Sequence, residues 1–130
     1  MIIFLRHGEA ENNVKKILAG RTPGINLTEQ GKQQAEQAGE MIKSLNISAI
    51  YSSPIDRAMQ TAEIVGKHCD VKPISDDRLI ELDMGKFTMV PYTEIFKNHG
   101  NVFLKFYEGS LEISHNGVES FTEVQKRVFD

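Results

Sequence analysis

The sequence predicts an α/β domain whose central sheet is mostly parallel. Two observations support this: short apolar runs alternate with stretches of helical periodicity, and the first run, Ile2–Leu5, is apolar on consecutive residues. A strand that is apolar on both faces is typical of a parallel sheet covered by helices on both sides. The length of 130 residues fits a single domain over residues 1–130.

The first half of the chain contains two predicted helices and a strand between them. Apolar residues recur at helical spacing from Thr28 to Leu45, and Thr28 is suited to be the N-cap. A second strand is expected at Ile47–Tyr51. The next helix is expected from Pro54, which needs no amide hydrogen in a first turn, to about Lys67.

The second half predicts one further strand and two helices. Val71–Ile74 is expected to be a brief strand at a sheet edge, because Pro73 cannot donate to a strand pairing. Tyr92–Phe106 is expected to be helical and divided in two at Gly100. The last helix is expected at Glu119–Val128.

The composition excludes several classes of partner. Hydrophobic residues make up 40% and charged residues 25%, and the net charge of −3 provides no bulk positive field for nucleic acid or anionic lipid. Cys69 is the only cysteine, which fits a reducing compartment. The apolar start is too short for a signal peptide and no run approaches the roughly 20 residues of a membrane span. We therefore expect a cytoplasmic protein.

A candidate catalytic cluster, Arg6-His7-Gly8-Glu9, follows the first predicted strand. Ligands of parallel α/β sheets bind beyond the carboxyl ends of the strands. A neutral imidazole is a nucleophile, a guanidinium supplies paired donors for phosphate oxygens, and Gly8 lets the backbone come close to a neighbour. The alternative interpretation is a hydrogen-bonded histidine beside a solvated arginine.

A second cluster, Ser52–Ala62, spans the end of the second predicted strand and the start of the next helix. A helix N-terminus favours anions because its amides are free and its dipole end is positive. Arg57 in that first turn opposes the dipole, and a bound phosphate would explain its presence.

With three further motifs, these clusters resemble the histidine phosphatase superfamily, also called the phosphoglycerate mutase-like family. Two positions depart from the family pattern, Ala10 where Thr is usual and Asn26 where Asp is frequent. The matching segments, in chain order, are Arg6-His7-Gly8-Glu9 with Asn13, Gly20 with Asn26–Gly31 and Gln34-Ala35, Ser52–Ala62, Leu79–Glu81 with Gly85, and Gly117–Ser120.

The resemblance implies a three-layer α/β/α fold with a mostly parallel central sheet, and a phosphomonoester phosphatase. It implies that His7 attacks phosphorus and carries a phosphohistidine, with its other ring nitrogen held by a backbone carbonyl. Glu81 would protonate the leaving oxygen and then activate water, although Glu9 or Asp83 could take this role. The remaining pocket residues would be Arg6, Arg57, Asn13 and Gly8.

The family's second catalytic histidine lies beyond the point where this sequence stops. Ser114–Gly117 superficially resembles the turn that carries it, but we interpret His115 as a loop residue because the Gly117–Ser120 motif follows at once. We therefore expect either a fold that lacks its C-terminal part or one completed by a partner subunit, and leave a homo-oligomer open.

Three functions remain in competition at this stage. A phosphatase acting on a small phosphorylated metabolite is favoured over a phosphoglycerate mutase, because the stretch after Glu81 is short and Met89 stands where Gly is usual. The third is a phosphate-binding module with little turnover. No metal or other cofactor is expected. Four aromatic residues either cap the pocket or belong to the core: Phe87, Tyr92, Phe103 and Tyr107.

Overall fold

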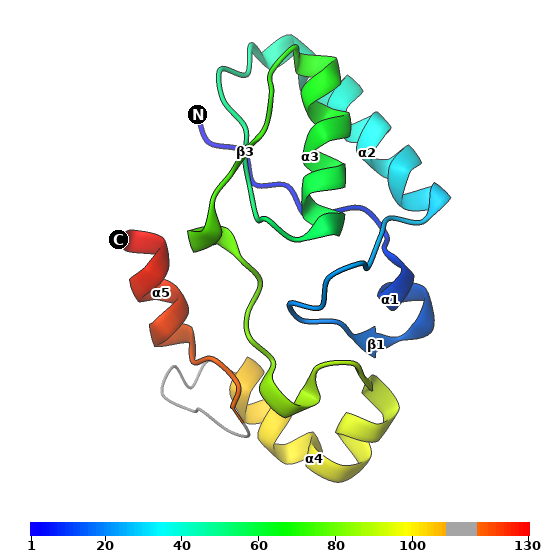
Figure 1. The fold of residues 1–130 in the computed structure, drawn as a ribbon, viewed down its shortest axis with the longest axis vertical. Coiled ribbons are helices and arrows are strands. Elements are labelled where there is room, and N and C mark those ends of the chain that lie inside the picture. The colour runs from blue at the N-terminus through cyan, green and yellow to red at the C-terminus, as the bar shows by residue number, and fades with distance from the viewer. Residues whose placement is uncertain (109–116) are drawn as a thin grey trace.

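The computed structural model describes residues 1–108 and 117–130, apart from the side chains of residues 102, 106 and 107. The described chain mixes helices with short strands (Figure 1), which confirms the α/β class. The elements, in order, are α1 (Glu11–Lys15), β1 (Ile17–Leu18), α2 (Glu29–Ile42), η1 (Lys43–Leu45), β2 (Tyr51–Ser52), α3 (Asp56–Cys69), β3 (Ile74–Ser75), η2 (Asp77–Leu79), η3 (Gly85–Phe87), β4 (Val90–Pro91), α4 (Tyr92–Tyr107) and α5 (Phe121–Phe129).

The strands are shorter than the sequence predicted. Among the described residues they form two pairs, β2 parallel to β3 and β1 antiparallel to β4. Only the C-terminal ends of the predicted strands Ile47–Tyr51 and Val71–Ile74 are therefore strands in the structure. There the amide of Ile74 donates to the Ile50 carbonyl at 2.8 Å.

The prediction of a buried first strand at Ile2–Leu5 is wrong for the described chain. No strand is assigned there, and the side chains of Ile2 and Phe4 are 81% and 93% exposed. A strand exists only where neighbouring backbone groups accept its hydrogen bonds, and consecutive apolar residues cannot supply that neighbour by themselves.

The helices agree better with their predictions because their signals are local. Thr28 caps α2, its hydroxyl accepting from the Gly31 amide at 3.1 Å. In α4 the backbone leaves the helical region at His99, beside Gly100 as predicted. Two boundaries move: Pro54 lies before the N-cap of α3 rather than in its first turn, and α5 begins at Phe121 after the N-cap Ser120.

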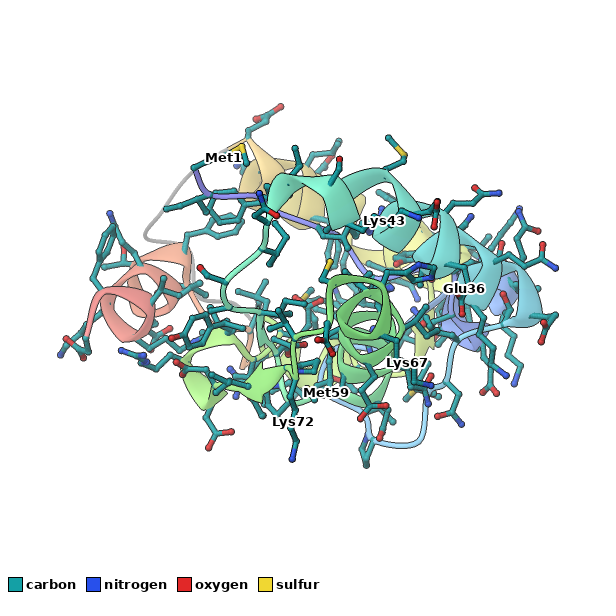
Figure 2. The ribbon with its side chains drawn as sticks, turned by 90° about the horizontal axis from the view of Figure 1, so that it is seen from above. Met1, Glu36, Lys43, Met59, Lys67 and Lys72 are labelled. Carbon is teal, nitrogen blue, oxygen red and sulfur yellow. The ribbon has the colours of Figure 1, made fainter. Side chains whose placement is uncertain are left out.

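Helices α2 and α3 lie side by side in both views (Figures 1 and 2). Gly39 makes this approach possible, because a Cβ there would lie 2.6 Å from Cδ2 of His68. The His68 ring also joins the helices, with Nε2 2.5 Å from Oε2 of Glu36. The pair is thereby fixed as one unit, and α3 carries Arg57 at its start.

The hydrophobic core lies away from this helix pair, between β1, η3, α4 and the start of the last segment. Phe87 and Phe103 are both buried there, with ring centroids 5.0 Å apart, and Tyr92 packs against the cluster. The core interpretation therefore holds for Phe87 and Phe103, whereas Tyr92 is only partly buried and acts electrostatically on Arg57, and the Tyr107 side chain lies outside the described residues. No helix in the described part of the chain is long and apolar enough to cross a membrane.

Candidate active site

The candidate nucleophile His7 lies in the segment that leads into α1. Its Nδ1 is 2.7 Å from the carbonyl oxygen of Gly8, so Nδ1 carries the proton and donates, and Nε2 keeps its lone pair. Burial lowers the pKa of the His7 imidazole below its ordinary value, and the charges of Arg57 and Arg6 act in the same direction. A neutral, nucleophilic imidazole at pH 7 follows.

Gly8 fixes this segment against both helices of the pair. A Cβ on Gly8 would lie 2.3 Å from the carbonyl oxygen of Gly31 in α2, so no other residue fits without displacing backbone. On the other side, the Gly8 amide donates to the Thr61 hydroxyl of α3 at 3.1 Å. The close approach that we expected of Gly8 is therefore made to the protein's own backbone.

Arg57 presents a buried guanidinium at the start of α3. The residue is 3% exposed, and its Nη2 donates to the Gly20 carbonyl at 2.8 Å. Its Nε and Nη1 have no hydrogen-bond partner among the described residues. Buried donors are normally paired, so two unpaired nitrogens on one cation indicate a site for an anion.

Glu81 completes the cluster from the segment between η2 and η3. Its Oε2 is 3.6 Å from Nη2 of Arg57, and its charge acts on the pKa of His7 in the direction opposite to Arg57. The carboxyl is about half exposed, and Oε1 accepts from the Leu82 amide at 2.8 Å. A carboxyl so placed can exchange protons with solvent and with a group bound at Arg57.

The other carboxylates considered for the same role serve structural contacts. Oε1 of Glu9 accepts from the Thr28 hydroxyl at 2.7 Å, which ties it to the start of α2. Oδ1 of Asp83 accepts from the Gly85 amide at 2.9 Å. Glu81 also accepts from a backbone amide, but its Oε2 lies 3.6 Å from Nη2 of Arg57 and its charge acts on the pKa of His7, which favours it over both alternatives.

Not every predicted pocket residue joins the cluster equally. Arg6 is exposed, and its charge contributes to the lowered pKa of His7. Asn13 uses its Oδ1 to accept from the Ala10 amide at 2.8 Å, which caps α1. His115 lies outside the described residues. Within the described chain, no group of three or more His, Cys, Asp and Glu side chains could hold a metal ion.

Two groups that build this cluster were missed in the sequence. The Thr61 hydroxyl accepts from Gly8 and donates to the Arg57 carbonyl at 2.8 Å, so it joins the two segments. The Gly20 carbonyl holds Arg57 from the loop after β1. Thr61 belongs to the Ser52–Ala62 segment. Its place on the inner face of the predicted helix suggested a packing role, so the two hydrogen bonds of its hydroxyl were not predicted.

The fold and this cluster belong to a known class of protein. A sequence profile of the histidine phosphatase superfamily (branch 1) matches residues 2–130. The chain therefore belongs to the histidine phosphatase superfamily.

Two curated relatives of the chain are named phosphoglycerate mutases. The chain is 44% identical over 84 residues, 65% of its length and 42% of the relative, to a 2,3-bisphosphoglycerate-dependent phosphoglycerate mutase of Thermoplasma acidophilum. It is 33% identical over 127 residues, 98% of its length and 59% of the relative, to a probable phosphoglycerate mutase GpmB of Salmonella choleraesuis. The chain thus spans about 40–60% of the length of these curated relatives.

Solved structures confirm the fold of the family. A mycobacterial glucosyl-3-phosphoglycerate phosphatase in complex with VO3 superposes with a TM-score of 0.88 at 28% identity, covering 95% of this chain and 58% of that one. Bacillus stearothermophilus YhfR superposes with a TM-score of 0.83 at 32% identity, covering 94% and 60%.

Proposed function

We propose that the chain carries the nucleophile and acid–base group of a phosphomonoester phosphatase. Nε2 of His7 attacks phosphorus while the bond to the ester oxygen breaks, and Glu81 protonates that oxygen as it leaves. Glu81 then takes a proton from water as the water attacks the phosphohistidine, which releases inorganic phosphate and restores His7. Such a proton transfer typically contributes about 10²–10⁴-fold to the rate.

One observation supports the proposal above the others, namely the buried Arg57 guanidinium with two unpaired nitrogens beside His7. Preorganised donors of this kind stabilise the charge on the phosphoryl oxygens in the transition state. A protein without an anionic ligand would gain nothing from a desolvated, half-paired cation at this place.

The test is phosphate release from 4-nitrophenyl phosphate by the 130-residue chain, beside His7→Ala and Glu81→Gln. We expect turnover that His7→Ala abolishes and Glu81→Gln reduces, with a phosphorylated histidine trapped in base-quenched wild-type protein. Turnover that persists in His7→Ala would refute the mechanism. Phosphate binding without turnover in the wild type would instead identify a phosphate-binding module.

A mutase is the second candidate, because both curated relatives described above are named phosphoglycerate mutases. A mutase would return the phosphoryl group from His7 to a bound sugar acid rather than to water. Incubation with 3-phosphoglycerate and a bisphosphoglycerate primer separates the two, since a phosphatase releases phosphate faster than it isomerises the substrate. Isomerisation that outpaces phosphate release would replace our proposal with this one.

A further inference from the structure

The segment that carries Glu81 has no regular secondary structure of its own. Residues 80–84 belong to neither a helix nor a strand, so their backbone is not fixed by a repeating pattern of hydrogen bonds. A general acid needs a defined position, because misplacement by about 1 Å can cost about 10²-fold in rate. Side chains from elsewhere in the chain must therefore hold this segment.

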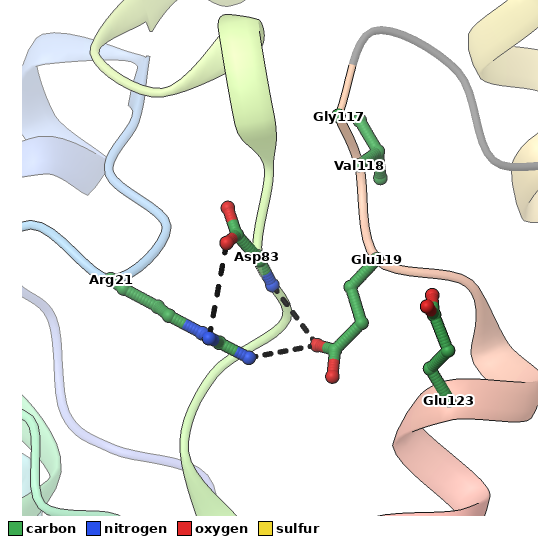
Figure 3. A pocket seen from close by; sticks show the side chains of 6 residues that line it. All are labelled: Arg21, Asp83, Gly117, Val118, Glu119 and Glu123. Atoms are coloured by element: carbon green, nitrogen blue, oxygen red, sulfur yellow. Dashed lines mark hydrogen bonds and ion pairs between the residues drawn. The ribbon is translucent and has the colours of Figure 1, made fainter.

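Arg21 makes the most direct contact with it. Its Nε donates to the carbonyl of Glu81 at 2.7 Å, and its Nη2 donates to Oε2 of Glu119 at 2.9 Å. Figure 3 shows the guanidinium reaching between Asp83 and Glu119, where they line a cleft of about 280 Å³. The planar guanidinium of arginine holds two acceptors in fixed directions, whereas the lysine ammonium is a compact charge on a flexible stem.

Glu119 supports this contact from the other side. Its carboxylate accepts from the Asp83 amide at 3.2 Å and from Nε of Arg127 at 2.8 Å, while its own amide donates to the Asp83 carbonyl at 2.8 Å. Burial alone would raise the pKa of Glu119, but the hydrogen bonds from Arg127 and Asp83 outweigh it and lower the pKa. Arg127 also donates to the carbonyl of Arg78, just before this segment, so the backbone is contacted on both sides of Glu81.

The loop that carries Arg21 also holds the phosphate-site cation. Gly20, the preceding residue, accepts from Nη2 of Arg57 at 2.8 Å. Two adjacent residues therefore contact the two charged residues of the site: the Gly20 carbonyl accepts from the Arg57 guanidinium, and the Arg21 guanidinium donates to the backbone carbonyl of Glu81. Nη2 of Arg57 and Oε2 of Glu81 lie 3.6 Å apart.

We infer that Arg21 is a positioning residue that keeps the Glu81 carboxyl beside Arg57 and His7, by holding the Glu81 carbonyl against the Glu119 carboxylate. The chemical role of Glu81 rests on the proposed function, whereas the positioning of its segment does not. The first experiment below depends on both, and the second on the positioning alone.

The first experiment compares two substrates that differ in their need for an acid. 4-Nitrophenolate leaves readily without a proton, whereas phenolate does not, so losing the acid slows phenyl phosphate more. Arg21→Gln should lower kcat/KM, which reports the step that expels the leaving group, about tenfold for phenyl phosphate, a fraction of the 10²–10⁴-fold of a whole general acid, with a smaller loss for 4-nitrophenyl phosphate. Lys32→Gln removes the same charge from an exposed ion pair with Glu29 and should change neither rate.

Two further variants distinguish the positioning of Glu81 by Arg21 from the effect of the Arg21 charge and from a general disturbance of the fold. Arg21→Lys keeps the charge but loses the two-acceptor fork, so it should share the defect. In a Glu81→Gln background, Arg21→Gln should cause no further loss, because both changes remove the same function. An equal loss on both substrates, or additive losses in the double variant, would overturn the inference.

The second experiment does not require turnover. Backbone hydrogen exchange of the Leu82 and Asp83 amides should be about tenfold faster in Arg21→Gln, because their acceptors are carboxylates that Arg21 helps to hold. The Lys32→Gln control should exchange like the wild type. Unchanged exchange in Arg21→Gln would refute the positioning even if the wild type is active. Faster exchange in Arg21→Gln, together with no turnover in the wild type, would retain the positioning and refute only the proposed function.

Discussion

Replacing Arg57 with methionine should stabilise the chain and abolish its affinity for phosphate. The side chain is 3% exposed, Nε and Nη1 have no partner among the described residues, and Nη2 is held by the Gly20 carbonyl. Burying a cation whose donors are only partly paired costs folding free energy until an anion binds the remaining donors. Methionine fills a similar volume without any donor.

The magnitude follows from these contacts. Each unpaired buried nitrogen costs about 1–3 kcal/mol, so methionine relieves about 2–6 kcal/mol. The lost charged hydrogen bond to Gly20 removes about 1.5–3 kcal/mol, and the ion pair with the half-exposed Glu81 adds at most about 1 kcal/mol. The balance is centred on a stabilisation of about 1 kcal/mol in the absence of phosphate, and its lower limit is a loss of about 2 kcal/mol.

Urea unfolding followed by far-UV circular dichroism measures both effects. Phosphate at a hundred times its dissociation constant should raise the unfolding free energy of the wild type by about 2.7 kcal/mol, and that of Arg57→Met hardly at all. Arg78→Met, which removes an exposed arginine, should keep the phosphate-induced gain. A loss of more than about 2 kcal/mol in Arg57→Met without phosphate, or an undiminished gain with it, would refute the reasoning.

Three further predictions concern the segment around the nucleophile. Gly8→Ala should cost about 1–3 kcal/mol in urea unfolding, because its methyl would meet the Gly31 backbone, whereas Gly100→Ala, with open space around it, should cost nothing. Because burial lowers the pKa of folded His7, the unfolded chain binds its proton more tightly; the unfolding free energy should fall as pH drops below about 6.5, and His7→Gln should flatten that dependence. Thr61→Val leaves the buried Gly8 amide unpaired and should lower the unfolding free energy by about 1–3 kcal/mol, most of which Thr61→Ser should restore.

The helices could be predicted because their signals are local, and the strands could not. The Thr28 hydroxyl accepts a hydrogen bond from the Gly31 amide, which is only three residues away in the sequence. A strand depends on neighbours far along the sequence, and the apolar run Ile2–Leu5 carries no information about whether they are there. The hydrophobic pattern therefore predicted the α/β fold class correctly but predicted longer strands than the structure contains.

The residues of the candidate site also differ in whether the sequence could predict them. His7, Arg57 and Glu81 were predicted because their side chains are chemically distinctive and their motifs resemble a family, and the structure places them near one another. Arg21 and Glu119 were missed, since an arginine in a loop and an acid before a helix have ordinary explanations. The predicted last helix, Glu119–Val128, would put Glu119 in its first turn, but this residue lies ahead of the N-cap and binds two arginines and a backbone amide.

The exposed run at the start of the chain has a consequence for its behaviour in solution. Ile2, Phe4 and Leu5 present large apolar surfaces to water, on backbone that belongs to no assigned strand. Extended apolar segments of this kind offer free amides and carbonyls to any other chain, which is how edge-to-edge aggregation starts. A net charge of −3 opposes such contacts only weakly. Light scattering of the isolated 130-residue chain should therefore rise steeply with its concentration, and replacing Phe4 with lysine should suppress that rise.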